Sequence, residues 1–285
     1  GDGCSDILVC RWENTTFLYE HPCFLFYGGT PPDSQYDDYF TDLKPVFEPI
    51  GDMNSDGYVD LGMFHAPTWS FRYLFGGPAF DDVPDFSIYN RASDPSKVVD
   101  LDADGELDAI LNEYLGGSFA FVYSVGSERD TVPEWVIPDT TTGFGYAVAT
   151  GDFNGDGWHD LVISAAKSLR PSFIKFYWGG PDFDTIPDLV IAGTSNRFGE
   201  VLVPVGDFNG DGFEDIFIGG PGDHPYGIYY GGPNLDDTMD IVLNSDGWSY
   251  WAPVSVAAGG DYNNDGYPDL IMGDMIPVAF YFAFK

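Results

Sequence analysis

The sequence predicts an all-β fold, a β-propeller of four-stranded blades, from three observations. An acidic nine-residue motif recurs five times in the 285 residues, about once every 50 residues. The intervals hold short β-branched or aromatic runs separated by Gly- and Pro-rich turns, which is the pattern of strands and hairpins. No segment has the apolar period of an amphipathic helix. Tandem units of this length with four strands each are typical of propeller blades.

The acidic motif has the form Asp-x-Asn/Asp-x-Asp-Gly-x-x-Asp, and its five copies are called loops 1 to 5. They cover residues 52–60, 100–108, 152–160, 207–215 and 261–269. Side-chain oxygens at positions one, three and five, a backbone carbonyl at position seven and a carboxylate at position nine can surround a Ca2+ ion. Gly at position six permits the sharp turn. We therefore predict a calcium site in every loop, about five Ca2+ per chain.

These five positions of each loop supply the predicted metal ligands. They are Asp52, Asn54, Asp56, Tyr58, Asp60, Asp100, Asp102, Asp104, Glu106, Asp108, Asp152, Asn154, Asp156, Trp158, Asp160, Asp207, Asn209, Asp211, Phe213, Asp215, Asp261, Asn263, Asp265, Tyr267 and Asp269. An EF-hand would also place a bidentate Glu at position 12, but that position is apolar in all five copies. A short apolar run follows each loop instead, so we expect the metal to clamp a turn between two strands. A truncated copy with Asp2 and Asp6 lacks the first half of the motif, and we expect it to bind weakly or not at all.

The other elements follow in a fixed order within each unit. In the unit of loop 4, a run at 201–205 enters the loop and a second strand at 215–219 leaves it. An aromatic run at 227–230 ends in a Gly-Gly turn, and an acidic loop then leads to a fourth run at 240–243. The Gly-Gly turn recurs in three other units, whereas the unit of loop 2 has Ser124-Val-Gly126. Each complete unit therefore corresponds to one four-stranded blade.

The repeats make the whole chain, residues 1–285, one predicted propeller domain. Its units are approximately 1–44, 45–96, 97–143, 144–198, 199–252 and 253–285. Six repeats are visible, of which the first and last are incomplete, so we expect six or seven blades in the intact protein. The aromatic run at 278–284 would then lie at a sheet edge, where another strand can add. Completion by another part of the protein and self-assembly through the incomplete end blades are both open.

The charge of the chain excludes whole classes of partner. Lys and Arg number 11 against 46 acidic residues, which gives a formal net charge of -35. Such a chain repels nucleic acid and anionic membrane surfaces, and no apolar run approaches the roughly 18 residues that span a bilayer. We therefore expect no nucleic-acid partner and no membrane insertion.

Three clues indicate an extracellular or cell-surface, secreted protein. Cys10 and Cys23 flank a 12-residue segment that could join neighbouring antiparallel strands, a separation that a disulfide can bridge. Asn14 begins a glycosylation sequon within that segment. Together with the heavy Asp loading, these features favour an oxidising, calcium-rich exterior. We predict a disulfide between Cys10 and Cys23, with Cys4 free or paired outside the chain.

The motifs resemble the FG-GAP repeats of the integrin alpha-subunit propeller and of many secreted bacterial and fungal proteins. The similarity lies in Phe144-Gly145 and Phe198-Gly199 before the first strand, in the Asp-Phe-Asn-Gly-Asp-Gly loops, and in Gly220-Pro221 or Ala66-Pro67 after the second strand. It covers essentially the whole chain and implies the propeller architecture and calcium binding. Family members include adhesion receptors, lectin-like propellers and domains attached to enzymes, so the resemblance implies architecture more directly than activity.

Aromatic residues in the loops opposite the metal sites form the predicted ligand-binding set. These loops join the second strand to the third and the fourth strand to the next blade. The set is Trp12, Trp69, Tyr226, Trp248, Tyr250 and Trp251. Such rings can stack on sugars or anchor a protein partner. Packing between the blades is the alternative role, because propeller cores are rich in aromatic residues.

We interpret the chain as a non-catalytic, calcium-stabilised propeller for adhesion, recognition or structural assembly, with a protein or glycan as its partner. A filament or surface subunit that assembles with itself is one form of this interpretation. A carbohydrate-binding, lectin-like propeller is the first alternative, and a glycoside hydrolase or lyase domain is the second. The four His residues show no two-His metal spacing, and no pair of carboxylates stands out for glycoside hydrolysis. We therefore predict that the chain is not an enzyme.

Overall fold

The part of the chain that the computed structural model describes contains 22 β-strands and no helix. The described residues are 7–10, 23–26, 38–40, 47–54, 56–65, 68, 70–77, 80–81, 83–89, 97–112, 119–125, 131–139, 143–166, 172–193, 197–220, 225–243, 255–273 and 278–281. Within them, the strands form four four-stranded and two three-stranded antiparallel sheets, and strands consecutive in sequence are neighbours in each sheet.

The strands are short, as the runs between the turns predict. The first three sheets contain β1 (Ile7–Cys10), β2 (Cys23–Phe26), β3 (Asp38–Phe40); β4 (Phe47–Gly51), β5 (Asp60–His65), β6 (Ser70–Leu74), β7 (Phe86–Ile88); and β8 (Val98–Val99), β9 (Asp108–Asn112), β10 (Phe119–Ser124), β11 (Trp135–Pro138). The other three contain β12 (Phe144–Gly151), β13 (Asp160–Ala165), β14 (Phe173–Tyr177), β15 (Leu189–Ala192); β16 (Val201–Gly206), β17 (Asp215–Gly219), β18 (Tyr226–Tyr229), β19 (Ile241–Leu243); and β20 (Ser255–Gly260), β21 (Asp269–Gly273), β22 (Val278–Tyr281).

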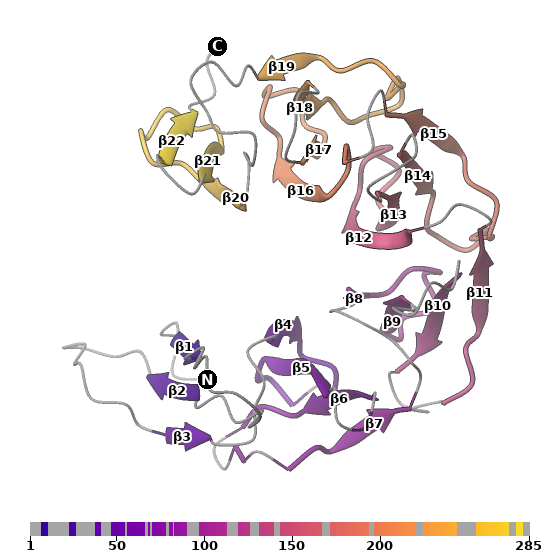
Figure 1. Cartoon of the computed structure of the whole chain (residues 1–285), viewed down its shortest axis with the longest axis vertical. Helices are drawn as coiled ribbons and strands as arrows, with labels where there is room; N and C mark the ends of the chain where they lie inside the picture. Colours follow the sequence, from indigo (N-terminus) through magenta and orange to yellow (C-terminus); the bar gives the residue numbers. More distant parts are fainter. Residues whose placement is uncertain are drawn as a thin grey trace.

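The six sheets are arranged around a common centre (Figure 1). In each four-stranded sheet the first strand, β4, β8, β12 or β16, lies nearest the centre and the fourth strand lies outermost. The β1–β3 and β20–β22 sheets face each other across the open side of the ring. This architecture is a β-propeller, so the predicted fold class is confirmed.

The hydrophobic core lies between the sheets. Among the described residues, buried apolar side chains form four clusters, each of which joins two sheets that are neighbours in the ring. One cluster joins Val122 and Ile137 of the β8–β11 sheet to Leu161 and Tyr177 of the β12–β15 sheet. Full burial of one such side chain contributes about 1.5–3 kcal/mol. The interfaces between the blades therefore hold the described part of the ring together.

The two Phe-Gly pairs mark where a blade begins against its predecessor. Phe144 and Phe198 are 3% and 5% exposed, and each belongs to a cluster that crosses a blade boundary. The glycines that follow them, Gly145 and Gly199, have φ angles of +83° and +87°. This left-handed conformation is strained for residues with a Cβ. The pair thus combines an anchoring ring with a turn that only Gly adopts readily.

A second set of Asp residues holds the outer turn of the blades. The Asp before the fourth strand accepts a hydrogen bond from the backbone N–H that precedes the Gly-Gly turn. The pairs are Asp85 with Phe75, Asp188 with Trp178, and Asp240 with Tyr230, each at 2.8 Å. Part of the Asp excess is therefore explained by turn structure, outside the metal loops.

Candidate metal centre

Loops 1 to 5 each connect the first strand of a sheet to the second. Loop 1 joins β4 to β5, loop 2 joins β8 to β9, loop 3 joins β12 to β13, loop 4 joins β16 to β17 and loop 5 joins β20 to β21. Because the strands of each sheet are antiparallel and consecutive, the turn from the third to the fourth strand lies at the same end of the sheet. The acidic loops and the Gly-Gly turns are therefore neighbours.

All five loops share one pattern of hydrogen bonds. The carboxylate at position one accepts from the N–H of the Gly at position six, at 2.8–3.1 Å. Position three accepts from the N–H of position five, and position five accepts from the N–H of position seven. The Gly at position six has a φ of +90° to +97° in every loop. The backbone thus folds around its own carboxylates, and the Gly is required for that turn.

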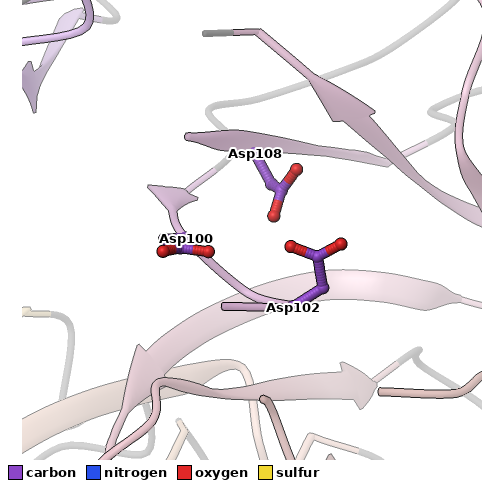
Figure 2. A group of neighbouring side chains, drawn as sticks. All are labelled: Asp100, Asp102 and Asp108. Atoms are coloured by element: carbon purple, nitrogen blue, oxygen red, sulfur yellow. The ribbon is translucent and has the colours of Figure 1, made fainter. Parts of the chain in front are cut away.

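Loop 2 brings three carboxylates together. Asp100, Asp102 and Asp108 each offer one oxygen, and these oxygens all lie within 4.8 Å of one another (Figure 2). Asp108 stands at the start of β9 and faces the two loop residues. Among the residues that the structure describes, no other trio of His, Cys, Asp or Glu meets this spacing. Positions one, three and nine of the predicted site therefore converge in loop 2.

The Asp at position nine has a structural role that the sequence did not reveal. In loops 1, 3 and 4 it is buried, and one oxygen accepts from the N–H of position two at 2.7–2.9 Å. Its other oxygen accepts from the first Gly of the Gly-Gly turn, at Gly76, Gly179 or Gly231. A Cβ on that Gly would lie only 1.9–2.3 Å from the carbonyl oxygen of position eight. Gly is therefore required for this bridge between the loop and the turn.

Loop 2 differs because Val125 occupies the place of that first Gly. Ser124 pairs with Asp108 across β9 and β10, and Val125 comes next. The Val125 N–H donates to the carbonyl of Leu107 at 2.8 Å. In the blades of loops 1, 3 and 4 the equivalent N–H donates to the Asp at position nine. Because the Val125 N–H uses the Leu107 carbonyl, one Asp108 oxygen receives no hydrogen bond from the turn and can share a cation with Asp100 and Asp102.

In loops 1 to 4, burial raises the pKa of the Asp at position nine, so that this residue is difficult to ionise. Removal from water raises the pKa of Asp108 to about 7, and the negative charges of Asp102 and Asp104 act in the same direction. Burial likewise raises the pKa of Asp160 to about 7 and that of Asp215 to about 6, against the opposing effect of backbone hydrogen bonds. A bound cation is the usual means by which clustered carboxylates remain ionised.

The residues of loop 2 fit a hard cation. The three side chains provide only carboxylate oxygens, the donors that Ca2+ prefers. Asp100 Oδ1 is buried and has no hydrogen-bond partner, and a buried acceptor without a partner is costly unless another group satisfies it. A divalent cation among these oxygens would satisfy it. The exposed Asp104 at position five lies outside the trio.

The aromatic prediction was wrong for Tyr226. This residue is 1% exposed in β18 and its ring lies 6.1 Å from that of Phe217, within the cluster between the β16–β19 and β20–β22 sheets. All four residues of β18 are buried, so Tyr226 packs between blades and offers no ring to a ligand. The other aromatic residues of the set, Trp12, Trp69, Trp248, Tyr250 and Trp251, lie outside the described residues, as does Asn14.

Two further contacts of the loops were not predicted. Glu214, at position eight of loop 4, accepts a hydrogen bond from the N–H of Asp152 in loop 3. Phe213, at position seven of loop 4, lies against Gly155 of loop 3. Neither residue type recurs at its position in all the loops, so the repeat gave no signal for these contacts.

Comparison with known proteins decides the family. Residues 144–168 match the FG-GAP repeat, and residues 207–272 match the FG-GAP-like repeat. The chain contains FG-GAP repeats. Integrin alpha-IIb of Mus musculus is 32% identical over 246 residues, which covers 74% of this chain and 22% of that protein. Integrin alpha-7 of Mus musculus is 31% identical over 165 residues, 53% of this chain and 14% of that protein.

The similarity to the integrin alpha subunits covers only a small part of each of those proteins. This chain spans between about an eighth and a quarter of the length of these relatives. Among solved structures, the biofilm matrix protein Bap1 of V. cholerae aligns with a TM-score of 0.43 and 17% identity, over 81% of this chain and 34% of that one. Within its described residues, this FG-GAP chain has no helix long and apolar enough to cross a membrane.

Proposed function

We propose that this FG-GAP chain is a non-catalytic, extracellular propeller that Ca2+ stabilises and that serves adhesion or recognition. The observation that carries the calcium part is the convergence of Asp100, Asp102 and Asp108, with one buried carboxylate oxygen that has no protein partner. The same motif recurs in four other loops, so we extend the proposal to about five ions per chain.

The ion would neutralise carboxylates that the fold places side by side. Positions one, three, five and nine would supply side-chain oxygens, and position seven would supply a carbonyl oxygen. The chain's own residues already hold these groups in place, because backbone N–H donors orient the carboxylates at positions one, five and nine. Five bound Ca2+ would bring the formal net charge from -35 to about -25, which relieves repulsion within the ring.

The adhesion part rests on family resemblance. The chain is 32% identical to integrin alpha-IIb over 74% of its own length, and adhesion receptors are among the proteins that carry this propeller. Extracellular placement agrees with calcium loops and with the register that sets Cys10 opposite Cys23. A protein or glycan is the expected partner.

The test measures calcium and binding separately. Metal analysis of protein dialysed against Ca2+ should find about five ions per chain, and fewer than three would contradict the calcium proposal. Calcium-loaded protein should then bind one or more members of a panel of immobilised extracellular matrix proteins or a glycan array, and a chelator should abolish the signal. Full calcium occupancy with no binding to either panel would overturn the adhesion proposal and leave the calcium proposal intact.

A further inference from the structure

Loop 4 contacts loop 3, and loop 5 contacts loop 4. In both pairs the side chain at position seven of the later loop lies on the earlier loop, and in loop 4 the side chain at position eight contacts it as well. Glu214 Oε2 accepts from the N–H of Asp152 at 3.1 Å, across 62 residues of sequence. Asp152 is position one of loop 3, so this bond fixes the backbone that carries a predicted ligand.

The ring at position seven covers the preceding loop. A Cβ on Gly155 would lie 2.4 Å from ring carbons of Phe213, and a Cβ on Gly210 would lie 2.2 Å from the ring of Tyr267. Both glycines stand at position four, with φ angles of +79° and +76°. The ring of loop 4 therefore lies directly on loop 3, and the ring of loop 5 lies directly on loop 4.

A backbone bond joins the same two blades beside these side chains. The N–H of Gly232, in the turn next to loop 4, donates to the carbonyl of Phe153 in loop 3 at 2.7 Å. Phe213 also lies against Gly232, where a Cβ would be 2.8 Å from its ring. Three contacts therefore connect loop 4 and its turn to positions one, two and four of loop 3.

We propose that these contacts couple the metal loops in series, so that an ion in loop 4 raises the affinity of loop 3 through Glu214 and Phe213. The proposal rests on the calcium binding proposed above. An ion in loop 4 fixes the backbone of positions seven and eight, because position seven is a predicted ligand. With this backbone fixed, Glu214 stays hydrogen-bonded to the Asp152 N–H and the Phe213 ring stays packed against Gly155. By linkage, an ion in loop 3 favours loop 4 by the same factor.

Loop 3 can be observed by itself. It is the loop with Trp at position seven, Trp158, where the other four have Tyr, Glu, Phe and Tyr. Tb3+ replaces Ca2+ as the probe, and its luminescence is excited through tryptophan. The variant Trp158→Phe identifies the share of the signal that comes from loop 3. Titration of that share gives the affinity of loop 3 for Tb3+.

The decisive variant empties loop 4. Asp211→Asn removes a carboxylate ligand at nearly constant shape, and Asp207→Asn is added if metal analysis still finds loop 4 filled. We expect the affinity of loop 3 to fall at least about fivefold, in the usual range of coupling between sites. Asp265→Asn empties loop 5, which contacts loop 4, and it should change the affinity of loop 3 less than Asp211→Asn does.

A second pair of variants tests the connection itself. Glu214→Ala should lower the affinity of loop 3 for Tb3+ about tenfold, because a hydrogen bond to a charged group is lost. Glu214→Gln should retain most of that affinity, because the amide oxygen still accepts the hydrogen bond. In Glu214→Ala, emptying loop 4 should have a smaller effect on loop 3, as a double-mutant cycle would show. Pro268→Ala is the matched control, because Pro268 holds the equivalent place against Gly206 without a hydrogen bond.

The outcomes separate this inference from the proposed function. No Tb3+ or Ca2+ binding at any loop overturns both. Suppose that the unmodified protein binds metal at all loops. The coupling is then overturned if Asp211→Asn leaves the affinity of loop 3 for Tb3+ unchanged, or if Asp211→Asn and Asp265→Asn lower that affinity equally. Either result leaves the calcium proposal intact. If Glu214→Ala does not fold, Glu214→Asp replaces it, because its shorter side chain withdraws the carboxylate from the Asp152 N–H.

Discussion

Cys10 lies directly opposite Cys23 in the antiparallel pairing of β1 with β2. Directly opposed residues in such a pair have Cα atoms about 4.5–5.5 Å apart, which is within the range of a disulfide. We expect mass spectrometry of non-reduced protein from an oxidising compartment to find the two residues linked. Replacing both by Ser should cost about 3 kcal/mol of stability, whereas Cys4→Ser should have little effect. Alkylation of Cys10 and Cys23 as free thiols would contradict the prediction.

The stability of metal-free protein should fall as the pH rises. The folded-state pKa values of Asp108 and Asp160 are about 7 and that of Asp215 is about 6, above the ordinary value of 3.8. The unfolded chain therefore loses these protons near pH 4, while the folded chain keeps them until the pH approaches 6 to 7. Their stabilising contribution is complete below pH 4 and is lost as the pH passes about 7.

Calorimetry in a chelator should thus show a lower Tm at about pH 8 than at about pH 5. Saturating Ca2+ should weaken or reverse this trend, because the cation favours the ionised carboxylates. A Tm of chelated protein that rises between these two pH values would be inconsistent with the buried carboxyl groups described above.

Asp108→Asn should have opposite effects with and without metal. The amide removes a buried charge and can still accept from the Leu101 N–H, which lies 2.9 Å from Asp108 Oδ2. We expect the free energy of unfolding of the metal-free protein near pH 8 to rise by on the order of 1–2 kcal/mol. In the presence of Ca2+, the variant should bind one ion fewer per chain. Asp104→Asn is the control, because Asp104 is exposed and its replacement should leave the metal-free stability nearly unchanged. Equal effects of the two variants in metal-free protein would show that burial of Asp108 is not the cause.

Gly155→Ala should destabilise the protein more than Gly157→Ala. Both glycines are in loop 3 with positive φ angles, +79° and +94°, so a Cβ strains the backbone at either position by about 1–2 kcal/mol. Gly155 alone has the Phe213 ring in the way, whereas nothing lies within 4 Å of a Cβ on Gly157. Overpacking adds about 1–3 kcal/mol. Denaturation in saturating Ca2+ measures the difference, and equal losses would mean that the ring moves aside freely.

Ala103→Gly should stabilise loop 2. Ala103 is at position four with a φ of +64°, where loops 3 and 4 have glycines. Gly adopts this left-handed conformation without the strain that the Ala Cβ causes. We expect the free energy of unfolding to rise by about 1 kcal/mol after the larger unfolded-state entropy of Gly is included. Asn264, with a φ of +58° at position four of loop 5, tolerates this conformation better than Ala does. Asn264→Gly should therefore give a smaller gain, and the two thermal denaturation curves can be compared directly.

The fold was predictable because each of its signals is local and repeated. The loops and the short strands recur about once every 50 residues, and the Gly-Gly turn recurs in most units, so one unit largely predicts the others. The loop side chains were predictable for the same reason, since Asp100 and Asp102 are placed by the turn at Gly105. The motif also places Asp108 at position nine, at the start of the second strand.

The remaining features depend on contacts between units that the repeat does not encode. Position eight is Val, Leu, His, Glu and Pro in the five loops, so no pattern marks Glu214 as a partner of Asp152. Val125 was visible as an irregular turn, but its effect on Asp108 depends on which acceptor its N–H reaches. Tyr226 was assigned to an exposed loop because its strand begins one residue earlier than the aromatic run suggested, and all of that strand is buried.

The ring that one loop lays on the glycine of the loop before it also bears on how such an array can grow in evolution. Loop 4 carries both halves of this contact, since Phe213 covers Gly155 and Gly210 is covered by Tyr267. If the unit of loop 4 were duplicated, the ring at position seven of the second copy would lie against the Gly at position four of the first. Gene duplication of the segment from β16 to β19 would therefore create a new blade boundary with its key contacts already in place, and the number of blades could change without redesign of the interface.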